Sequence, residues 1–588
     1  MKNIFQLNWM TDEGLRLDCE WNDCLCNVTL TNISNEKKKI GDITVFSAKM
    51  PFAPDTEFFG EGYTILSRYC GTVGGEFKLI GTYDDYDFYK SYRPEGLKQV
   101  YNMAMFYPKD KLPVIIGFAS CNRFNGWIRF NEEVLQIALN CENISVEPNE
   151  TIRLEQIYIE QGEKDRIREN LADALLKNHP RRNFPEIPTG WCSWLVYASR
   201  VTAQNIYDNL DAIIKRGLDL KYIQIDDGYQ AHWGDWFDFT DNFEGGVKKL
   251  CLDIKAKGFE PAMWVAPFVA EKDSKVFTEH PDWFVKDDSG KPLSSGDVSY
   301  GGWRHGPWYI LDMTHPEAQN YIRTVFRTMR HEWQVKYFKL DAINWEAMPY
   351  GHRYDDTKTC IEAFKIGMQV ISEEVGEESF ILGGNSPLWP SIGMVNGMRI
   401  TNDNSRRWSK FVNLCRECFP RNWMHNKFWI NDPDTVLLQN KRVKVVDIAG
   451  NETVENKTSI TDDEFRVNAA YTMASGGMVL SGDDVSALTD ENVSLLKKLL
   501  PSVQVAAEFD DNSYTVGRAK ISDTKTIIYV FNFDDVEKDI DVRLDREYEV
   551  FELFSGDSMG YFNESVRFTK FKPHFATILV CTRREGNC

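Results

Sequence analysis

The stretch Tyr337-Phe338-Lys339-Leu340-Asp341 places residues that could do chemistry at the end of an apolar run. Alternation in a strand puts Lys339 and Asp341 on one face and Phe338 and Leu340 on the other. A nearby ammonium favours the ionised form of a carboxylate, so this pair suits an ionised nucleophile. A surface salt bridge at a strand end explains the stretch equally well. The rest of the sequence is needed to choose between an ionised nucleophile and a surface salt bridge.

Further carboxylates follow apolar runs in the same region: Asp226, Asp227, Asp403, Asp432, Asp434, Asp483 and Asp484. Such a set, together with the seventeen tryptophans of the chain, suits glycoside hydrolysis. In that reaction two carboxylates flank the scissile bond, and others accept hydrogen bonds from sugar hydroxyls. For Asp432, Asp434, Asp483 and Asp484, a helix N-cap in the following loop is the better prediction.

The motifs of several other chemistries are missing from the sequence. There are nine histidines and no H-E-x-x-H motif, and Cys415 and Cys418 form a lone C-x-x-C. We therefore expect no metal site. No P-loop, G-x-S-x-G or G-x-G-x-x-G follows a strand, so we expect no nucleotide cofactor. A Mg²⁺ enzyme of the enolase type remains an alternative, because it also uses strand-end acids and a lysine.

The elements that carry these carboxylates have the pattern of βα units. Apolar runs of four to eight residues alternate with amphipathic helical stretches, which is typical of a parallel sheet. There are eight such runs, the number in a (β/α)8 barrel, whose catalytic groups lie at the C-terminal strand ends. The runs are 190–194, 222–227, 261–266, 337–341, 380–385, 398–400, 428–432 and 478–484.

Short alternating runs before and after this region predict β-rich flanks. The fold class that we expect is α/β, a central (β/α)8 TIM barrel with an N-terminal β-sandwich and a small C-terminal antiparallel β domain. A chain of 588 residues exceeds what one core usually supports. The predicted limits are 1–160 for the N-terminal domain, 161–188 for a helical linker, 189–490 for the barrel and 491–588 for the C-terminal β-sandwich domain.

The composition of the chain indicates which classes of partner and which cellular compartment to expect. The net charge of −20 argues against nucleic acid or an anionic membrane surface. No run approaches the ~18 apolar residues of a membrane span, and residues 1–13 lack the pattern of a signal peptide. Thirteen cysteines, an odd number, predict free thiols in a reducing compartment. We therefore expect a cytoplasmic protein that binds a small-molecule or oligosaccharide substrate, and homo-oligomerisation is left open.

The barrel region resembles the α-galactosidases of glycoside hydrolase family 36, in a clan shared with α-N-acetylgalactosaminidases. The resemblance covers about 185–490 in order and spacing, and the flanking β regions fit the three-domain layout of the family. The matching blocks are Gly190-Trp191-Cys192-Ser193-Trp194, Gln224-Ile225-Asp226-Asp227-Gly228-Tyr229, Gly234-Asp235-Trp236, Trp264-Val265-Ala266-Pro267-Phe268, His280-Pro281-Asp282-Trp283, Phe338-Lys339-Leu340-Asp341, Gly397-Met398-Arg399-Ile400 followed by Asp403, and Asn431-Asp432-Pro433-Asp434.

The resemblance implies a retaining exo-glycosidase that hydrolyses terminal α-linked galactose from oligosaccharides or glycoconjugates without a cofactor. Asp341 matches the nucleophile of the family and Asp403 its general acid/base. Lys339 would keep Asp341 charged, while Asp403 must stay protonated near neutral pH. The residues that match sugar-binding positions are Asp226 and Asp227, for the galactose 4- and 6-hydroxyls, and Lys339, Arg399 and Trp264.

Three departures from the family pattern concern substrate choice. Leu195 stands where the family often has Tyr, and the segment 404–407 is more polar and basic than expected. The fifth strand ends Gly383-Gly384-Asn385, so that Gly384 replaces the usual cysteine near the sugar 2-position. Gly384 and Asn385 would then admit a 2-acetamido group, and α-N-acetylgalactosaminidase is an alternative. A raffinose-synthase-like α-galactosyl transglycosylase, with the same two carboxylates, is another.

Overall fold

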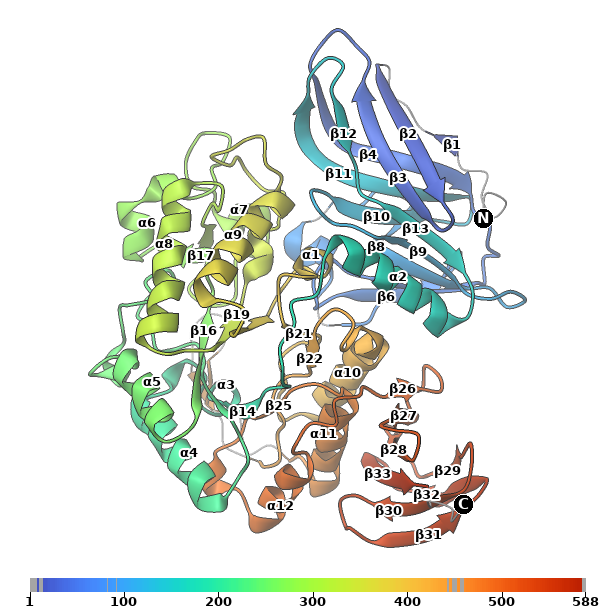
Figure 1. Cartoon of the computed structure of the whole chain (residues 1–588), viewed down its shortest axis with the longest axis vertical. Helices are drawn as coiled ribbons and strands as arrows, with labels where there is room; N and C mark the ends of the chain where they lie inside the picture. The colour runs from blue at the N-terminus through green and yellow to red at the C-terminus, as the bar shows by residue number, and fades with distance from the viewer. Residues whose placement is uncertain are drawn as a thin grey trace.

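The computed structural model describes residues 8–9, 14–81, 83–90, 92–440, 444–446, 452–454 and 459–583. Figure 1 shows antiparallel sheets in blue and teal at the N-terminal end, a mixed helical and strand region in green to orange, and smaller sheets in red at the C-terminal end. Most of residues 1–13, on which the expectation of no signal peptide rests, lie outside the described residues.

The N-terminal strands form one hydrogen-bonded set of thirteen, and every printed pair among them is antiparallel. Strands from both ends of the pairing order share one apolar core, as in a β-sandwich. The strands are β1 (Asn8–Trp9), β2 (Leu15–Asn22), β3 (Leu25–Asn32), β4 (Lys38–Lys49), β5 (Glu57–Glu61), β6 (Arg68–Thr72), β7 (Phe77–Leu79), β8 (Lys98–Tyr107), β9 (Val114–Phe118), β10 (Asn125–Phe130), β11 (Val134–Val146), β12 (Thr151–Arg153) and β13 (Ile157–Gln161).

Two helices belong to this end of the chain. The short helix α1 (Asp85–Tyr89) precedes β8, and α2 (Lys164–Asn178) follows β13. Helix α2 buries Ile167, Leu171 and Leu175, whose spacing places them on one face. The helical pattern that the sequence predicts near 163–177 is therefore present.

The eight runs of the middle region form one parallel sheet, so the predicted barrel is confirmed. Its strand order, β22-β21-β20-β19-β16-β15-β14-β25, follows the chain around the barrel. The two end strands approach each other, since the Met478 amide donates to the Asn431 carbonyl at 2.9 Å. The barrel is thus nearly closed. Its strands are β14 (Thr189–Cys192), β15 (Tyr222–Ile225), β16 (Glu260–Val265), β19 (Tyr337–Leu340), β20 (Phe380–Gly383), β21 (Gly397–Arg399), β22 (Ile430–Asp432) and β25 (Val479–Ser481).

Local signals delimit the barrel helices. In α4 (Ala203–Arg216) the Thr202 side chain accepts from the Asn205 backbone amide, and the Asn205 side chain accepts from the Thr202 backbone amide. This pair of hydrogen bonds is a capping box. Gly217 ends the helix at φ 58°, a left-handed conformation that glycine adopts without strain. The other helices of this region are α3 (Trp194–Tyr197), α5 (Val247–Ala256), α6 (Lys275–Glu279), α7 (Ser295–Val298), α8 (Pro316–Arg327), α9 (Cys360–Val375), α10 (Trp408–Cys418), α11 (Asp462–Ala474) and α12 (Asp490–Lys498).

Side chains fill the barrel interior. Buried residues of seven barrel strands form one cluster, in which the Tyr337 ring lies edge-on to the rings of Tyr222 (5.4 Å) and Phe380 (5.1 Å). A filled interior of this kind leaves room for chemistry only at the strand ends.

The C-terminal strands form a six-stranded sheet and a two-stranded sheet that share one apolar core. They are β26 (Glu508–Phe509), β27 (Val516–Lys520), β28 (Lys525–Asn532), β29 (Lys538–Arg543), β30 (Tyr548–Glu552), β31 (Ser558–Phe562), β32 (Ser565–Phe571) and β33 (Phe575–Thr582). Two further pairs are β17 (Val269–Glu271) with β18 (Trp308–Ile310), and β23 (Lys444–Val446) with β24 (Glu452–Val454). The domain limits at 160, 188 and 490 stay predictions.

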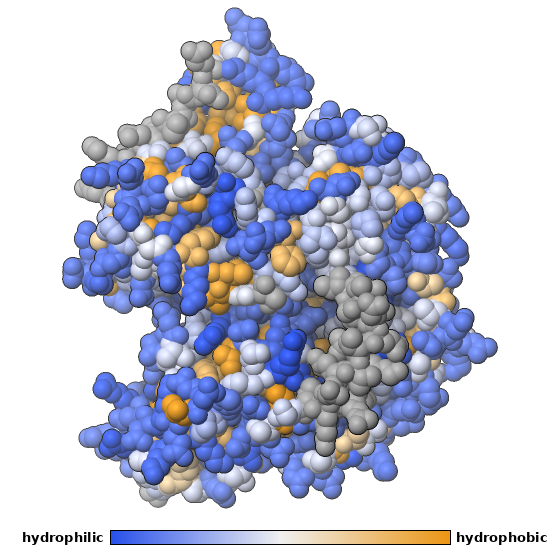
Figure 2. Space-filling model, turned by 180° about the vertical axis from the view of Figure 1, so that it is seen from behind, coloured by the Kyte–Doolittle hydropathy of each residue, from blue (hydrophilic) through white to orange (hydrophobic). Residues whose placement is uncertain are grey.

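The surface of the face shown in Figure 2 is mostly hydrophilic, with apolar residues in separate patches. Among the residues that the structure describes, no helix has both the length and the apolar character needed to span a bilayer.

Candidate active site

The C-terminal ends of neighbouring barrel strands bring the predicted site residues to one rim. Asp226 and Asp227 follow β15, Trp264 lies in β16, and Asp341 follows β19. Gly384 and Asn385 follow β20, while Arg399 ends β21 and Asp403 lies four residues beyond. Since β15, β16, β19, β20 and β21 are consecutive in the sheet, these side chains share one end of the barrel.

The Asp341 carboxylate is held from three sides. Its Oδ2 accepts from Trp264 Nε1 at 3.0 Å, and its Oδ1 accepts from Asn385 Nδ2 at 2.7 Å and from the Ala342 amide at 2.8 Å. All three donors favour the ionised form. Burial raises the pKa of Asp341, the Lys339 charge and the Trp264 hydrogen bond act to lower it, and the negative charge of Asp403 raises it again.

The Asp403 carboxylate lies beside a guanidinium. Arg399 Nη2 is 2.9 Å from Asp403 Oδ1, and the Asp403 side chain is 56% exposed. Partial burial acts to raise the pKa of Asp403, but the charges of Arg399 and Lys339 outweigh it, so the pKa lies below its usual value. The direction is opposite to what a general acid needs at neutral pH, and solvent at this exposed group screens the effect.

Lys339 has a different partner from the one expected. Its Nζ is 2.9 Å from Asp226 Oδ2, and both side chains are buried. Within a barrel, the side chains of one interior layer come from alternate strands, so β19 meets β15 across the interior. Lys339 therefore forms its ion pair with Asp226. Its effect on Asp341 is electrostatic, because its positive charge acts to lower the pKa of that carboxyl group.

Asp226 and Asp227 point to different sets of partners. Asp226 Oδ2 also accepts from Gln224 Nε2 at 2.7 Å, and its Oδ1 accepts from the Asp227 amide at 3.0 Å. Asp227 Oδ1 accepts from Arg304 Nη2 at 2.6 Å and from Trp233 Nε1 at 3.2 Å. Asp227 Oδ2 is buried without a partner, so Asp227 has an acceptor to offer a substrate hydroxyl. Burial raises the pKa of Asp227 while the Arg304 charge opposes this.

The Gly384-Asn385 turn lies against Asp341. A Cβ built on Gly384 would lie 3.6 Å from Asp341 Oδ1 and 3.2 Å from the Leu340 carbonyl. Asn385 has a left-handed φ of 43°, and its amide is already engaged with Asp341. The turn therefore leaves space beside the carboxylate, while the Asn385 amide orients that carboxylate.

Of the four acids predicted to cap helices, one does so and three do not. Asp484 accepts from the Ser486 amide at 3.1 Å and caps the short 3₁₀ helix η8 (Val485–Ala487), as predicted. The prediction is wrong for the other three. Asp432 accepts from the Asp434 amide at 2.9 Å, Asp434 lies 3.5 Å from Arg399, and Asp483 lies 2.5 Å from Arg406. These three acids are buried, and Asp434 and Asp483 pair with arginines from other parts of the barrel rim.

The basic segment 404–407 is explained by one buried cation. Arg406 donates to the Leu195 carbonyl at 3.0 Å, to the Gln439 carbonyl at 2.8 Å and to Asp483 Oδ1 at 2.5 Å. Arg406, which follows β21, is thus hydrogen-bonded to the segments that follow β14, β22 and β25. Leu195 packs at the edge of a neighbouring apolar cluster.

The N-terminal part of the chain also reaches the rim, which the sequence did not indicate. The Phe88 ring lies between the rings of Tyr83 (4.2 Å) and Tyr300 (4.8 Å). Burial raises the pKa of Tyr83 and the Asp403 charge adds to this, and burial, Tyr83 and Asp341 do the same for Tyr300. Tyr83 therefore lies near Asp403 and Tyr300 near Asp341, the two predicted catalytic acids. Arg304 and Trp233 on Asp227 were missed as well, because Trp233 lies in the irregular loop after β15 and Arg304 in the one between α7 and β18, neither with a motif.

No set of three or more His, Cys, Asp or Glu side chains suited to a metal ion occurs among the described residues. The twelve cysteines of the described chain are free, and Cys415 and Cys418 are buried in α10. The absence of a metal or nucleotide requirement stays a prediction.

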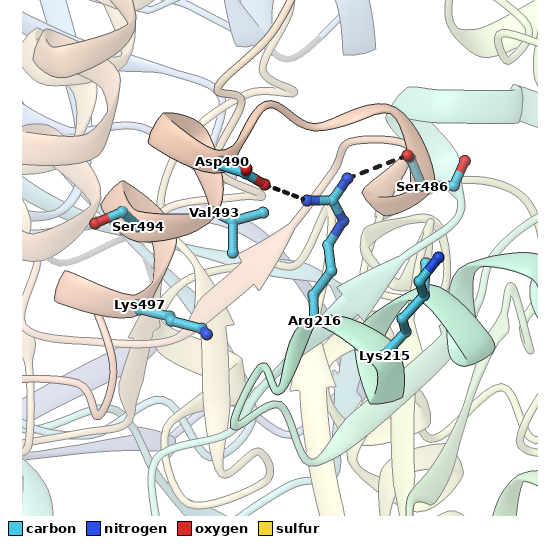
Figure 3. A pocket seen from close by; sticks show the side chains of 8 residues that line it. Lys215, Arg216, Ser486, Asp490, Val493, Ser494 and Lys497 are labelled. Atoms are coloured by element: carbon cyan, nitrogen blue, oxygen red, sulfur yellow. Dashed lines mark hydrogen bonds and ion pairs between the residues drawn. The ribbon is translucent and has the colours of Figure 1, made fainter.

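A cavity of about 700 Å³ lies away from the rim, between α4 and α12. Figure 3 shows Arg216 of α4 crossing it to Asp490 and to the Ser486 carbonyl, with Lys215 and Lys497 at its sides. None of the predicted site residues lines it. It is a groove between helices bridged by an ion pair, not the site described above.

Residues 201–378 match the protein-family model described as Melibiase. An α-galactosidase of Escherichia coli is 32% identical over 135 residues, which cover 22% of this chain and 18% of that protein. The myogenesis-regulating glycosidase of Mus musculus is 27% identical over 161 residues, which cover 27% of this chain and 22% of that protein. The chain thus spans about a fifth of the length of these relatives.

Similar solved structures extend over more of the chain. An α-galactosidase from Thermus thermophilus, in complex with p-nitrophenyl α-D-galactopyranoside, has a TM-score of 0.65 at 20% identity and covers 86% of this chain and 95% of that one. A GH36 α-galactosidase from Geobacillus stearothermophilus has a TM-score of 0.67 at 13% identity, covering 97% and 81%. A GH27 β-L-arabinopyranosidase from the same organism has a TM-score of 0.56 at 17% identity, covering 68% and 98%. The fold is therefore shared with both glycoside hydrolase families.

Proposed function

We propose that the chain is a glycoside hydrolase that removes terminal α-linked galactose. The observation that carries the proposal is the pair Asp341 and Asp403 at the rim of the barrel, close enough for the charge of one to raise the pKa of the other. Two carboxyl groups in different surroundings are what a glycosidase needs for its nucleophile and its acid/base. The match to the Melibiase family model and the fold shared with α-galactosidases support the same reaction.

We assign the nucleophile to Asp341. Three donors fix its carboxylate, and one of its oxygens faces the space left by Gly384. In a retaining reaction this carboxylate attacks the anomeric carbon and forms a covalent glycosyl-enzyme. The hydrogen bonds from Trp264 and Asn385 hold it ionised and aimed, which lowers the cost of reaching the attack geometry.

We assign the acid/base to Asp403. It is the more exposed of the two, so it can exchange its proton with the leaving group and then with water. Its ion pair with Arg399 favours the charged form, which is the base of the second step. Because Arg399 also lies 3.5 Å from Asp434, a bound substrate that draws Arg399 toward Asp434 would let Asp403 take a proton.

Galactose selectivity is assigned to Asp227 and Asp226. Asp227 Oδ2, which has no hydrogen-bond partner among the described residues, is an acceptor at the rim, and the Lys339–Asp226 pair offers a donor and an acceptor beside it. A sugar whose hydroxyl pointed elsewhere would leave Asp227 unpaired and desolvated, which costs about 1–3 kcal/mol. This supports α-galacto over α-gluco substrates, and Asp226→Asn should weaken that preference.

An α-N-acetylgalactosaminide is the second candidate substrate. The space above Gly384 favours it, since no Cβ occupies the position next to Asp341. The engagement of the Asn385 amide with Asp341 argues the other way, because that amide is not free for an acetamido group. A transglycosylase would use the same two carboxylates, and its product would depend on an added sugar acceptor.

The test combines product stereochemistry with two variants. Proton NMR of the first product from a nitrophenyl α-galactoside should show the α-anomer, and Asp341→Ala should lose nearly all turnover. Asp403→Ala should keep measurable activity on nitrophenyl substrates, whose leaving group needs little protonation, and lose it on melibiose. A β-anomer as first product, or equal losses on both substrates in Asp403→Ala, would refute the assignment. Rates on the paired nitrophenyl α-N-acetylgalactosaminide decide between the two sugars.

A further inference from the structure

A second cavity, of about 220 Å³, lies between the N-terminal sheet and the barrel. Its floor is one face of that sheet. Trp127 of β10 stands opposite Tyr101 of β8, and Asn125 of β10 stands opposite Asn140 of β11. Because Asn125 and Trp127 are two residues apart on one strand, both point to the same face. The floor therefore alternates aromatic rings with amides.

The walls come from two other parts of the chain. Asp85 and Tyr89 of α1 form one wall, and the segment 348–350, in the loop that follows β19, forms the other. Hydrogen bonds join the walls, since the Tyr63 hydroxyl donates to the Ala347 carbonyl and the Tyr350 hydroxyl donates to the Tyr89 carbonyl. Tyr92 also lines this cavity and is 62% exposed, so the cavity opens to the surface of the molecule.

Within the described part of the chain, three buried polar atoms of residues that line this cavity have no hydrogen-bond partner: Asp85 Oδ1, Asn125 Oδ1 and Trp127 Nε1. Their residues are 2–4% exposed. Asp85 Oδ2, by contrast, is used, since it accepts from the Tyr63 amide at 2.8 Å and from Ser67 Oγ at 2.6 Å. Buried polar atoms are nearly always paired, so two unpaired acceptors and one unpaired donor on residues that line one cavity favour a hydrogen-bonding ligand there.

We propose that this cavity binds a single neutral sugar ring. Hydroxyl groups supply both the donors that Asp85 and Asn125 need and the acceptor that Trp127 needs. The other aromatic rings that line the cavity, among them Tyr89 and Tyr101, offer apolar surface of the kind that packs against the C–H face of a sugar. The volume corresponds to about seven waters at ~30 Å³ each, below the size usual for larger ligands, which favours one ring over an oligosaccharide.

Charged ligands fit the same cavity less well. An organic cation would suit the aromatic rings and Asp85, but it would leave the Trp127 N–H unpaired. Lys90 also lines the cavity, and the Arg129 guanidinium lies 4.2 Å from the centre of the Trp127 ring, so two cations already stand there. An anion would face the Asp85 carboxyl. The inference does not rest on the proposed hydrolysis at the barrel rim.

The experiment is saturation-transfer NMR on the intact chain with D-glucose, D-galactose and choline as separate probes. Glucose is the decisive probe, because the barrel rim is proposed to select galactose. We expect glucose to bind, and Trp127→Phe, which removes the N–H and keeps an aromatic ring, to weaken binding about tenfold, as the loss of one good hydrogen bond would.

Two variants serve as controls. Trp429→Phe removes another buried, unpartnered indole N–H from a residue that does not line the cavity, and Asp226→Asn alters only the barrel rim. Both should leave glucose binding within about twofold of wild type. No saturation transfer to glucose, its loss in Asp226→Asn instead of Trp127→Phe, or binding of choline in place of glucose would overturn the proposal. Failure of the hydrolysis assay alone would leave it standing.

Discussion

Two cations at the barrel rim, Lys339 and Arg399, control the ionisation of the acids around them. Lys339 pairs with Asp226, and Arg399 stands between Asp403 and Asp434. Among the described residues, the proposed nucleophile Asp341 forms no ion pair with a cation and depends on neutral donors instead. Its charge therefore remains available for attack on a substrate, while Asp403 is the group whose ionisation a neighbour controls.

This arrangement predicts the effect of Arg399→Gln on the pH profile of kcat/KM. Asp403 must be protonated to act as an acid, so kcat/KM falls as the pH rises through its pKa. Arg399 lowers that pKa, which places the fall at low pH, so without Arg399 the basic limb should move to higher pH. Solvent at the exposed carboxylate screens part of this shift. KM should rise too, but an unmoved basic limb would contradict the role given to Arg399.

Gly384→Cys tests whether the turn after β20 recognises the sugar 2-position. The new Cβ would lie 3.6 Å from Asp341 Oδ1, so the thiol would occupy space beside the nucleophile. We expect a greater loss of kcat/KM, by about tenfold or more, for an α-N-acetylgalactosaminide than for the plain galactoside. Gly383→Ala is the matched control, because its Cβ would meet Ser386 and Met398 instead. Equal losses on both substrates in Gly384→Cys would show that the turn does not recognise the 2-substituent.

The position of these residues could be predicted from the sequence more easily than their partners. Asp226 and Asp341 end apolar runs, and in a parallel barrel such ends share one rim. The contact between Lys339 and Asp226 depends on the alternate layering of strands, which local alternation does not show. In the same way, Asp434 and Asp483 stand where loops often begin helices, yet each is paired with an arginine brought close only by folding.

At the scale of elements, α1 and the loop before it bring an aromatic side chain from the N-terminal region near Asp403, the proposed acid/base. Tyr83 contacts Phe88, and its pKa is raised by burial and by the charge of Asp403. In the proposed reaction the leaving group departs on the side of the acid/base, so we expect Tyr83 to border the site for the rest of the substrate. The sequence could not predict this, because nothing in a β-rich N-terminal region marks a residue for the barrel rim.

Tyr83→Ala should therefore weaken turnover of substrates with a sugar leaving group. Stacking of an aromatic ring on a sugar adds roughly 0.5–1.5 kcal/mol, so kcat/KM for melibiose should fall about three- to tenfold. The rate on α-galactosyl fluoride, whose leaving group is a single atom, should change less than twofold, a margin of ~0.4 kcal/mol. Tyr86→Ala, three residues further on in α1 and at a side chain that is 47% exposed, is the control. A parallel fall on both substrates would mean that Tyr83 supports the fold of the rim instead.

At the scale of the whole molecule, the N-terminal sheet is fastened to the barrel by buried polar contacts. Arg68 of β6 donates to the Glu417 carbonyl of α10 at 2.7 Å. Arg421, in the 3₁₀ helix η7 (Phe419–Met424), lies 2.8 Å from Glu61 of β5, and neither side chain has any exposed surface. Arg421 also donates to the Ser67 carbonyl at 2.9 Å and to the Ile400 carbonyl at 3.1 Å, next to β21. One side chain therefore joins the sheet to the strand that carries Arg399.

Such a contact lies beyond sequence-based prediction, since Glu61 and Arg421 are 360 positions apart and neither belongs to a motif. The eight apolar runs predict the barrel and the flanking alternation predicts the β-rich ends, because each is a local pattern in the sequence. The fastening between layers is a property of the folded chain. It also explains why the barrel rim includes Tyr83, which the fastened sheet holds in place.

Arg421→Met should destabilise the chain by about 3–5 kcal/mol, because it leaves the Glu61 carboxylate buried without a counter-charge. Urea unfolding followed by tryptophan fluorescence would measure this as a lower midpoint. The double variant Glu61→Leu with Arg421→Met should recover much of the loss, since no buried charge then remains unpaired. Arg16→Met, at an ion pair with Asp18 in which both side chains are more than half exposed, should change stability by less than about 1 kcal/mol. If Arg421→Met unfolds at the midpoint of Arg16→Met, the buried pair does not fasten the sheet to the barrel. If the double variant is no more stable than Arg421→Met, the loss comes from the carbonyl contacts of Arg421 and not from its charge.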